Sequence, residues 1–318
     1  MFTYEFRAMG SRIFLAMDTE KDPWPEFSVE VTRWFEDWEQ SLSRFRSSSE
    51  LCAFNHRSGE WQQVSEAFLQ VLELSLSVER KSNGIVTPAV LDALEAAGYN
   101  VSFEELGSTA DTWLRQPIFE TVSVRDIELD ASSRTVKTPK GMRLDFGGMA
   151  KGWAAHQAML KLAGIGPVLV DAGGDIAISA PLKDGSAWPI NIADPFDPTG
   201  NLGLLMIPSG GVATSGRDYR RWQSGGHWQH HLIDPRTNQP AQTEVFTATV
   251  IAENLLEAEA LSKQVLILGA GEAELLFKED SHKAFFLVLE SGETVQSNSF
   301  DYFKWMDPCQ TIQKQISA

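Results

Sequence analysis

The stretch RLDFGGMAKGWAAH, residues 143–156, places an Asp, two adjacent glycines and a lone Lys directly ahead of an alanine-rich segment. Apolar Leu144 suits the end of a strand, and the residues after Lys151 predict a helix that runs to Gly164. A helix that only packs into a core needs a cap rather than a glycine pair. The pattern therefore predicts a strand–turn–helix unit whose turn is shaped for a ligand.

The chemistry of this turn suits a nucleotide. Gly147 and Gly148 let the backbone turn sharply and approach a ligand closely. The first N–H groups of the following helix, its dipole and the charge of Lys151 favour a phosphate, while Asp145 can accept from a sugar or a base. A plain structural joint capped by Asp145 stays open as the alternative, since glycine-rich turns are common.

Composition restricts the classes of partner. The 318 residues are 43% hydrophobic and 22% charged, enough for one large domain or two smaller ones. The net charge, 27 − 43 = −16, argues against nucleic acid and against an anionic membrane surface. No apolar run has the length of a signal peptide or a membrane span, so we expect a cytoplasmic protein without membrane insertion. Cys52 and Cys309 are expected to be free thiols.

Strand-like and helix-like segments are mixed along the chain and indicate an α+β fold. Two strands are expected within Tyr4–Met17, turning near Gly10, with others in 167–179, 190–195, 211–216, 230–235 and 246–252. Helical spacing is clearest around residues 31–42, 66–82, 87–99, 151–164 and 253–269. A division into two lobes near residues 110–135 is weakly marked.

Four further segments carry candidate chemistry, each with a plain alternative. DAGGDI (171–176) is a tight hairpin or a second ligand loop, and TSGRDYRRW (214–222) is an anion-facing patch or a solvated loop. In HHLIDPRTNQP (230–240), His230 and His231 point to opposite faces of a strand, so at most one faces a given cleft as a general base. Glu259 and Lys263 share a helix face, as site residues or as a surface ion pair.

Taken in order, AMGS, LSRFRSSSELCAFN, LEAAGY, LDFGGMAKG, VDAGGDI, INIADP, VATSGRDYRR, HHLIDPRTNQP and TVIAENLLEAEALSK resemble the ApbE family, the FAD:protein FMN transferases. The resemblance extends roughly from Thr3 to Gly269. It implies a Mg²⁺-dependent enzyme that moves FMN from FAD onto a Thr hydroxyl of a target flavoprotein and releases AMP. The implied fold is α+β, with two pseudo-repeated, tunnelling-fold-like halves, mixed or antiparallel sheets and FAD in the cleft between them.

The resemblance also implies roles for individual residues. Met9 lies near the flavin or adenine, Phe45 covers the site, and His231 is the general-base candidate. Gly148 holds a position that supplies an oxygen to the metal. The remaining FAD-contacting positions are Ala97, Gly98, Tyr99, Asp145, Lys151 and Ile233.

The last helix departs from the family's pattern. The family's metal motif there is typically A-D-A-L-x-T, and this chain has AEALSK, residues 258–263. Glu259 still offers carboxylate oxygens, but Lys263 replaces the Thr, and an ammonium cannot ligate a cation. Lys263 is therefore expected to contact the pyrophosphate itself, and the binding of Mg²⁺ is in question. Two alternatives to the transferase stay open, a non-catalytic FAD-binding protein and a FAD pyrophosphatase that uses water.

Overall fold

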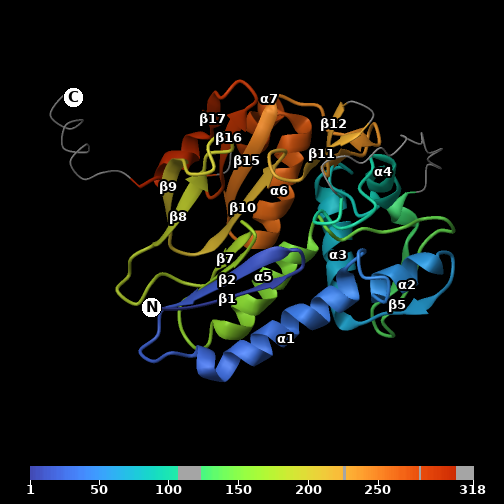
Figure 1. The fold of residues 1–318 in the computed structure, drawn as a ribbon, viewed down its shortest axis with the longest axis horizontal. Helices are drawn as coiled ribbons and strands as arrows, with labels where there is room; N and C mark the ends of the chain where they lie inside the picture. Colours follow the sequence, from blue (N-terminus) through green and yellow to red (C-terminus); the bar gives the residue numbers. More distant parts are fainter. Residues whose placement is uncertain (107–122, 225–226, 279–280, 306–318) are drawn as a thin grey trace.

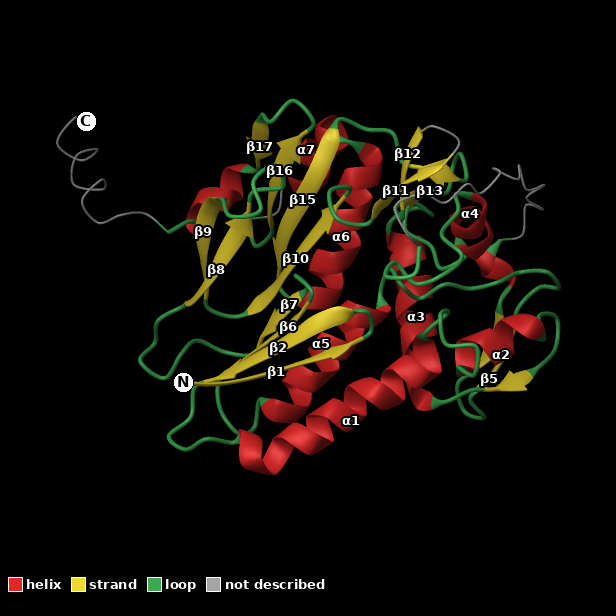
Figure 2. Ribbon diagram, viewed as in Figure 1, coloured by secondary structure: helices red, strands yellow, loops and turns green. Residues whose placement is uncertain are grey.

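An eight-stranded sheet forms the centre of the computed structural model, which describes residues 1–106, 123–224, 227–278 and 281–305 (Figures 1 and 2). Every pair of neighbouring strands in this sheet is antiparallel. In spatial order the strands are β1 (Phe2–Ala8), β2 (Ser11–Met17), β6 (Val168–Ala172), β7 (Ile176–Ile178), β10 (Gly210–Gly216), β15 (Val245–Ala252), β16 (Ala284–Leu289) and β17 (Thr294–Gln296).

Both faces of the sheet are covered, which explains why its central strands are apolar on both sides. One face packs on α1 (Trp24–Leu42), α5 (Ala150–Leu162) and α6 (Leu255–Leu268). In β15, Ala248 and Val250 face this helical layer, whereas Ile251 faces the opposite side. There it joins a second core with the hairpin of β8 (Trp188–Ala193) and β9 (Asn201–Ile207).

The remaining elements are smaller and lie around the sheet and its covering helices. The helices among them are α2 (Glu50–His56), α3 (Glu66–Lys81), α4 (Leu91–Ala96), α7 (Ala270–Phe277) and the 3-10 turns η1 (Val124–Asp126) and η2 (Asn298–Tyr302). The short strands are β3 (Gln62–Gln63), β4 (Glu128–Asp130), β5 (Thr135–Lys137), β11 (Arg221–Ser224), β12 (His227–His230), β13 (Ile233–Asp234) and β14 (Gln239–Pro240).

The α+β class is confirmed, and several boundaries follow from caps visible in the sequence. Ser65 accepts from the amide of Phe68 at 3.2 Å and begins α3, and Gly269, with φ +95°, ends α6. Ser49 is an equivalent cap, which accepts from the amide of Cys52 at 3.1 Å and begins α2. Cys52 carries a free thiol, whereas Cys309 lies outside the described residues.

Two predicted elements differ from the structure. The helix expected over 87–99 is confined to Leu91–Ala96, because the carbonyl of Pro88 accepts from the amide of Asp145 and joins the loop before α4 to the site. The strand expected over 230–235 is interrupted after His230, where the amide of Leu232 turns back to donate to the His230 ring at 3.3 Å.

The pseudo-repeated halves and the lobe division near 110–135 stay predictions, and residues 107–122 of that range lie outside the described part. Among the described residues, no helix is long and apolar enough to cross a membrane.

Candidate active site

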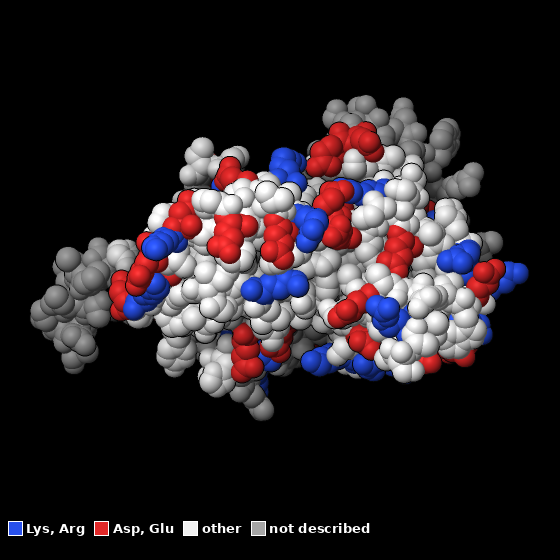
Figure 3. Space-filling model, turned by 90° about the horizontal axis from the view of Figure 1, so that it is seen from below, with Lys and Arg blue, Asp and Glu red and all other residues white. Residues whose placement is uncertain are grey.

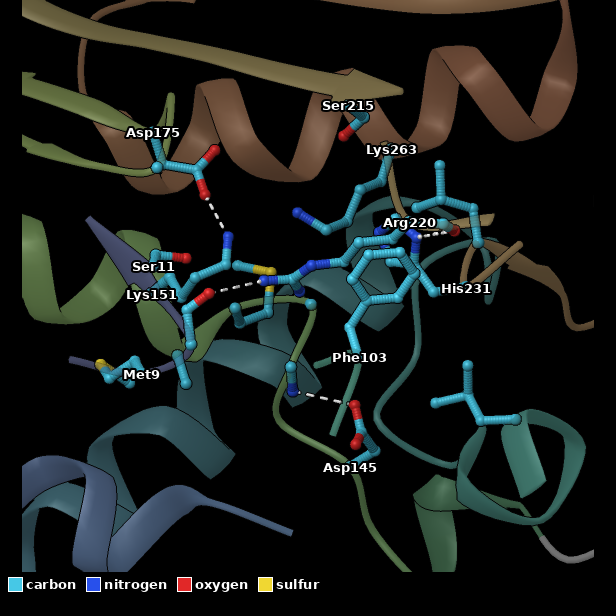
Figure 4. Close-up of a pocket in the computed structure, with 18 of the residues that line it drawn as sticks. Met9, Ser11, Phe103, Asp145, Lys151, Asp175, Ser215, Arg220, His231 and Lys263 are labelled. Carbon is cyan, nitrogen blue, oxygen red and sulfur yellow. Dashed lines mark hydrogen bonds and ion pairs between the residues drawn. The ribbon is translucent and has the colours of Figure 1, made fainter. Parts of the chain in front are cut away.

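A pocket of about 930 Å³ lies where the β1–β2 turn, the start of α5, the β6–β7 turn and α6 meet (Figure 4). This volume is at the upper end of the range for small-molecule sites, roughly 300–1,000 Å³, and accommodates a dinucleotide. Most of the residues predicted for the site line it: Met9, Phe45, Tyr99, Asp145, Gly148, Lys151, His231, Ile233 and Lys263. The other three, Ala97, Gly98 and Glu259, lie behind its surface and shape it from there.

The tip of the β1–β2 hairpin forms one edge of the pocket. Met9 and Gly10 have φ values of +53° and +63°, the left-handed pair that a two-residue hairpin turn requires. Such a φ is uncommon for a residue with a side chain. The backbone amide of Met9 donates to Glu39 at 2.9 Å and holds the residue in this conformation.

The glycine pair at the start of α5 supplies space rather than a left-handed backbone. Among the described residues with positive φ, neither Gly147 nor Gly148 appears. A Cβ on Gly148 would lie 3.5 Å from Cε of Lys263, so a larger side chain here would fill the pocket. The amide of Gly147 donates to Asp145, and the amides of Met149 and Ala150 both donate to the Phe146 carbonyl. These three amides therefore have partners within the chain and are not free for a ligand.

An arginine and three aromatic rings form the wall of the pocket. The guanidinium of Arg44 lies 4.1 Å from the ring centroid of Phe45 and 4.5 Å from that of Tyr99. Arg44 also donates to the Tyr99 carbonyl at 2.8 Å and pairs with Asp145 at 2.9 Å. Tyr99 packs on Trp222, with ring centroids 5.2 Å apart. We call Arg44, Phe45, Tyr99 and Trp222 the aromatic wall.

Ala97, Gly98 and Asp145 position this wall. The indole of Trp222 donates to the Ala97 carbonyl at 2.8 Å, and Gly98, with φ +98°, reverses the chain between α4 and Tyr99. Asp145 is only 7% exposed and uses one oxygen for Arg44 and the other for the amide of Gly147, 2.8 Å away. Asp145 is therefore held rigidly by its ion pair with Arg44 and its hydrogen bond from the amide of Gly147.

Two buried ion pairs form the floor of the pocket. Lys151 on α5 donates to Asp175 at 2.7 Å, and Lys263 on α6 donates to Glu259 at 3.1 Å. Asp175 follows the β6–β7 turn, in which Gly173 and Gly174 have φ values of +69° and +97°. DAGGDI is thus both a tight hairpin and part of the site. We call these two pairs the floor pairs.

A third cation, Arg220, extends toward the floor from the position immediately before β11. Figure 4 shows the side chains of Lys151, Arg220 and Lys263 pointing toward the same region from three different elements. Burial lowers the pKa of the Lys151 ammonium, but the carboxylates of Asp175 and Glu259 outweigh burial and raise it above its usual value. Lys151 therefore stays charged. On the face drawn in Figure 3, by contrast, basic and acidic side chains are interspersed over the surface.

Glu259, the carboxylate of the second floor pair, has no exposed surface. A Cβ on Gly152 of α5 would lie 2.2 Å from its Oε2, so the glycine makes room for the carboxylate. Burial raises the pKa of this carboxyl, and the neighbouring Lys263 ammonium opposes the rise. Its Oε2 has no hydrogen-bond partner among the described residues.

The donor set at this position does not fit a magnesium ion. Mg²⁺ takes oxygen ligands in near-octahedral geometry. Within the described ranges, no group of three His, Cys, Asp or Glu side chains is placed to hold a metal. Glu259, one of the two predicted metal positions, is paired with an ammonium, and a Cβ added to the other, Gly148, would lie 3.5 Å from Cε of Lys263.

The two adjacent histidines have different environments, as expected, although β12 ends at His230 and strand alternation does not extend to His231. His230 is buried and lies outside the pocket lining, and its Nε2 donates to the Ala241 carbonyl at 3.0 Å. Burial lowers its pKa to about 4. His231 lines the pocket, and its Nδ1 faces the Arg220 carbonyl at 3.4 Å. Burial, then the charge of Arg220, lowers the pKa of His231 well below the usual value. A neutral ring whose Nδ1 carries the proton leaves Nε2 free to accept one.

Sequence reasoning missed several residues that line or build the pocket. Arg220 lay within the basic segment 214–222, which was flagged without a choice among its three arginines. Arg217 is used elsewhere, donating to the carbonyls of Thr243 and Val245. Phe103 lines the pocket and packs on Tyr219, with ring centroids 5.7 Å apart, and no spacing signal pointed to it.

The fold and the site define an α+β protein with a dinucleotide-sized pocket, a cationic floor and an aromatic wall. The sequence profile of the ApbE family matches residues 9–286. The chain belongs to the ApbE family.

Individual relatives agree with this assignment. The FAD:protein FMN transferase of Klebsiella pneumoniae (strain 342) is 26% identical over 275 residues, which are 84% of this chain and 76% of that protein. That of Treponema pallidum (strain Nichols) is 29% identical over 269 residues, 79% of this chain and 73% of the relative. The crystal structure of the ApbE protein from Thermotoga maritima superposes with a TM-score of 0.81 at 24% identity, covering 96% of this chain and 99% of that one. The last likeness establishes the fold.

Proposed function

We propose that this protein is a FAD:protein FMN transferase, which moves FMN from FAD onto a Thr hydroxyl of a target flavoprotein and releases AMP. The observation that carries the proposal is the convergence of Lys151, Arg220 and Lys263 beside a neutral His231 in one pocket. The relatives that bear this activity in their names match most of the chain.

The two sides of the pocket divide the binding of FAD between them. The ring of Phe45, which is 42% exposed, offers an apolar face for a flavin or adenine ring, and Tyr99, Ile233 and Met9 add apolar surface. The diphosphate lies on the floor, where ammonium and guanidinium groups neutralise its charge. Holding both ends fixes the scissile P–O bond relative to His231.

His231 acts as the general base of the transfer. Its free ring nitrogen takes the proton of the acceptor Thr hydroxyl, and the Thr oxygen forms a bond to the phosphorus of the FMN half. The P–O bond to the adenylate breaks, and AMP leaves with the electron pair of that bond. Cations on the floor stabilise the charge that develops on the phosphates during this exchange.

The acceptor assay separates this proposal from its two alternatives. Purified protein is incubated with FAD and a flavoprotein domain that carries the acceptor Thr, and the products are examined for flavin fluorescence in a denaturing gel and for AMP. A transferase yields a fluorescent acceptor and one AMP per label. AMP without label indicates a FAD pyrophosphatase, and FAD binding without either product indicates a binding protein.

A variant of the base tests the assignment of His231. His231→Ala removes the acceptor nitrogen but none of the floor cations. Labelling is expected to fall by a factor on the order of 100 or more, while the Kd for FAD stays nearly unchanged. Undiminished labelling would place the base elsewhere.

A further inference from the structure

Lys263 belongs to the floor, and its side chain is held in place without a ligand. It starts on α6, lies where a Cβ added to Gly148 would come within 3.5 Å of its Cε, and is only 13% exposed. Its partner Glu259 is completely buried, so the pair has little freedom to separate. The ammonium is therefore held in one place, as a bound cation would be.

Charge at the floor already favours a diphosphate. Lys151, Arg220 and Lys263 bring three positive charges, and Asp175 and Glu259 bring two negative ones. In each pair one carboxylate oxygen, Oδ2 of Asp175 or Oε1 of Glu259, accepts from the ammonium, so a metal ion would compete with that ammonium for the carboxylate. A divalent cation bound to Glu259 would also lie beside the Lys263 ammonium. The two positive charges would repel each other strongly in a buried site.

We propose that the ammonium of Lys263 takes the place of a divalent cation at this site. Together with Lys151 and Arg220 it neutralises the diphosphate of FAD, and the pocket binds FAD without a metal. This inference rests on the proposed function, because it takes FAD as the ligand. It adds that Lys263 supplies the positive charge that Mg²⁺ supplies in the family's pattern.

The test compares two variants that differ by one ammonium. Glu259→Gln keeps Lys263 and removes the buried carboxylate. Glu259→Gln combined with Lys263→Met removes both charges, so the second variant leaves no unpaired buried carboxylate that would unfold the protein. Lys161→Met, an exposed site at the far end of α5, controls for the loss of one positive charge. The Kd for FAD is measured by flavin fluorescence in EDTA and in Mg²⁺, and Mn²⁺ binding is followed by electron paramagnetic resonance.

The expected result has three parts. The unmodified protein binds FAD equally in EDTA and in Mg²⁺, within about twofold, and does not immobilise Mn²⁺. The double variant binds FAD about tenfold or more weakly than Glu259→Gln, since hydrogen bonds between charged groups are worth about that much. Lys161→Met binds like the unmodified protein.

Two outcomes would overturn the inference while the proposed function stands. One is FAD binding by the unmodified protein that requires Mg²⁺ or is accompanied by stoichiometric Mn²⁺. The other is a double variant that folds, as its thermal transition shows, and binds FAD as tightly as Glu259→Gln. Failure of the unmodified protein to bind FAD under either condition would instead overturn the proposed function itself.

Discussion

The floor and the wall of the pocket are both buried, yet they are held together by different forces. The floor pairs are two ion pairs whose members come from three separate elements: Lys151 from α5, Asp175 from the β6–β7 turn, and Glu259 with Lys263 from α6. The wall is a stack of rings around one guanidinium, closed by the hydrogen bond from Trp222 to Ala97. The floor thus provides fixed charge, and the wall provides fixed apolar surface.

This difference indicates how each side should respond to substitution. Packing energy is lost in proportion to the apolar volume removed, so the wall is expected to be sensitive to large truncations. Buried ion pairs contribute little net stability while intact, but removing one partner or its space is costly. Ligand binding is expected to follow charge on the floor and ring surface on the wall.

The largest effect is expected at the base of the wall. Trp222 is 2% exposed, and Trp222→Ala is predicted to lower the free energy of unfolding by about 3–5 kcal/mol, measured by urea denaturation. Trp222→Phe keeps most of the packing and loses the indole donor, for a cost of about 1 kcal/mol. Equal losses for the two variants would show that the hydrogen bond, and not the packing, holds the wall.

Buried His230, outside the pocket lining, predicts a pH dependence of stability. The pKa of His230 in the folded protein, about 4, is below its unfolded value of about 6.5. The unfolded state therefore takes up the proton first, and stability is lost as the pH falls from about 6.5 to 4, by about 3 kcal/mol from this group. In His230→Gln the slope of unfolding free energy against pH over this window is expected to fall by about one proton. An unchanged slope would contradict a buried, neutral His230.

A smaller effect on stability is expected at Gly152, where α5 leaves space for the Glu259 carboxylate. In Gly152→Ala the new methyl group would lie 2.2 Å from the Oε2 atom of Glu259, which has no exposed space to move into. The clash, about 3 kcal/mol, outweighs the gain in helix propensity, about 1 kcal/mol, for a net loss of about 2 kcal/mol. A Cβ added at Gly164 would have no neighbouring atom within 4 Å, so Gly164→Ala is the matched control. It should change stability by less than about 0.5 kcal/mol.

The smallest effect separates binding from folding on the wall. Phe45 is 42% exposed, so Phe45→Ala should leave the unfolding transition nearly unchanged. Loss of its ring face is expected to raise the Kd for FAD by up to about tenfold, measured by quenching of flavin fluorescence. A Kd identical to that of the unmodified protein would remove Phe45 from the FAD contacts.

The floor was largely predictable from the sequence, because its residues lie in short motifs with fixed spacing. The segment DFGGMAKG places Lys151 at the start of a helix, and the four-residue spacing of Glu259 and Lys263 puts both on one helix face. Only the structure shows that this face is buried and that Lys151 has Asp175 as its partner. Partner choice between distant segments depends on the fold, which spacing alone does not determine.

The wall was harder to predict for a physical reason. Arg44 and Trp222 lie far apart in sequence and meet only through Tyr99, so no local period connects them. The glycine pair before α5 was expected to give both a sharp turn and close approach to a ligand, and its backbone is not left-handed. Glycine signals both a left-handed backbone and a need for space, and the sequence does not distinguish Gly148, which gives space, from Gly173, with φ +69°.

A crystal structure of the protein with FAD, grown in the presence of Mg²⁺, tests the account most directly. The account predicts the diphosphate on the floor, with phosphate oxygens within hydrogen-bonding distance of the Lys151 and Lys263 ammonium groups, a ring against Phe45 or Tyr99, and no metal density between Glu259 and the phosphates. FAD bound elsewhere, or a metal ion between Glu259 and the diphosphate with Lys263 displaced, would contradict it.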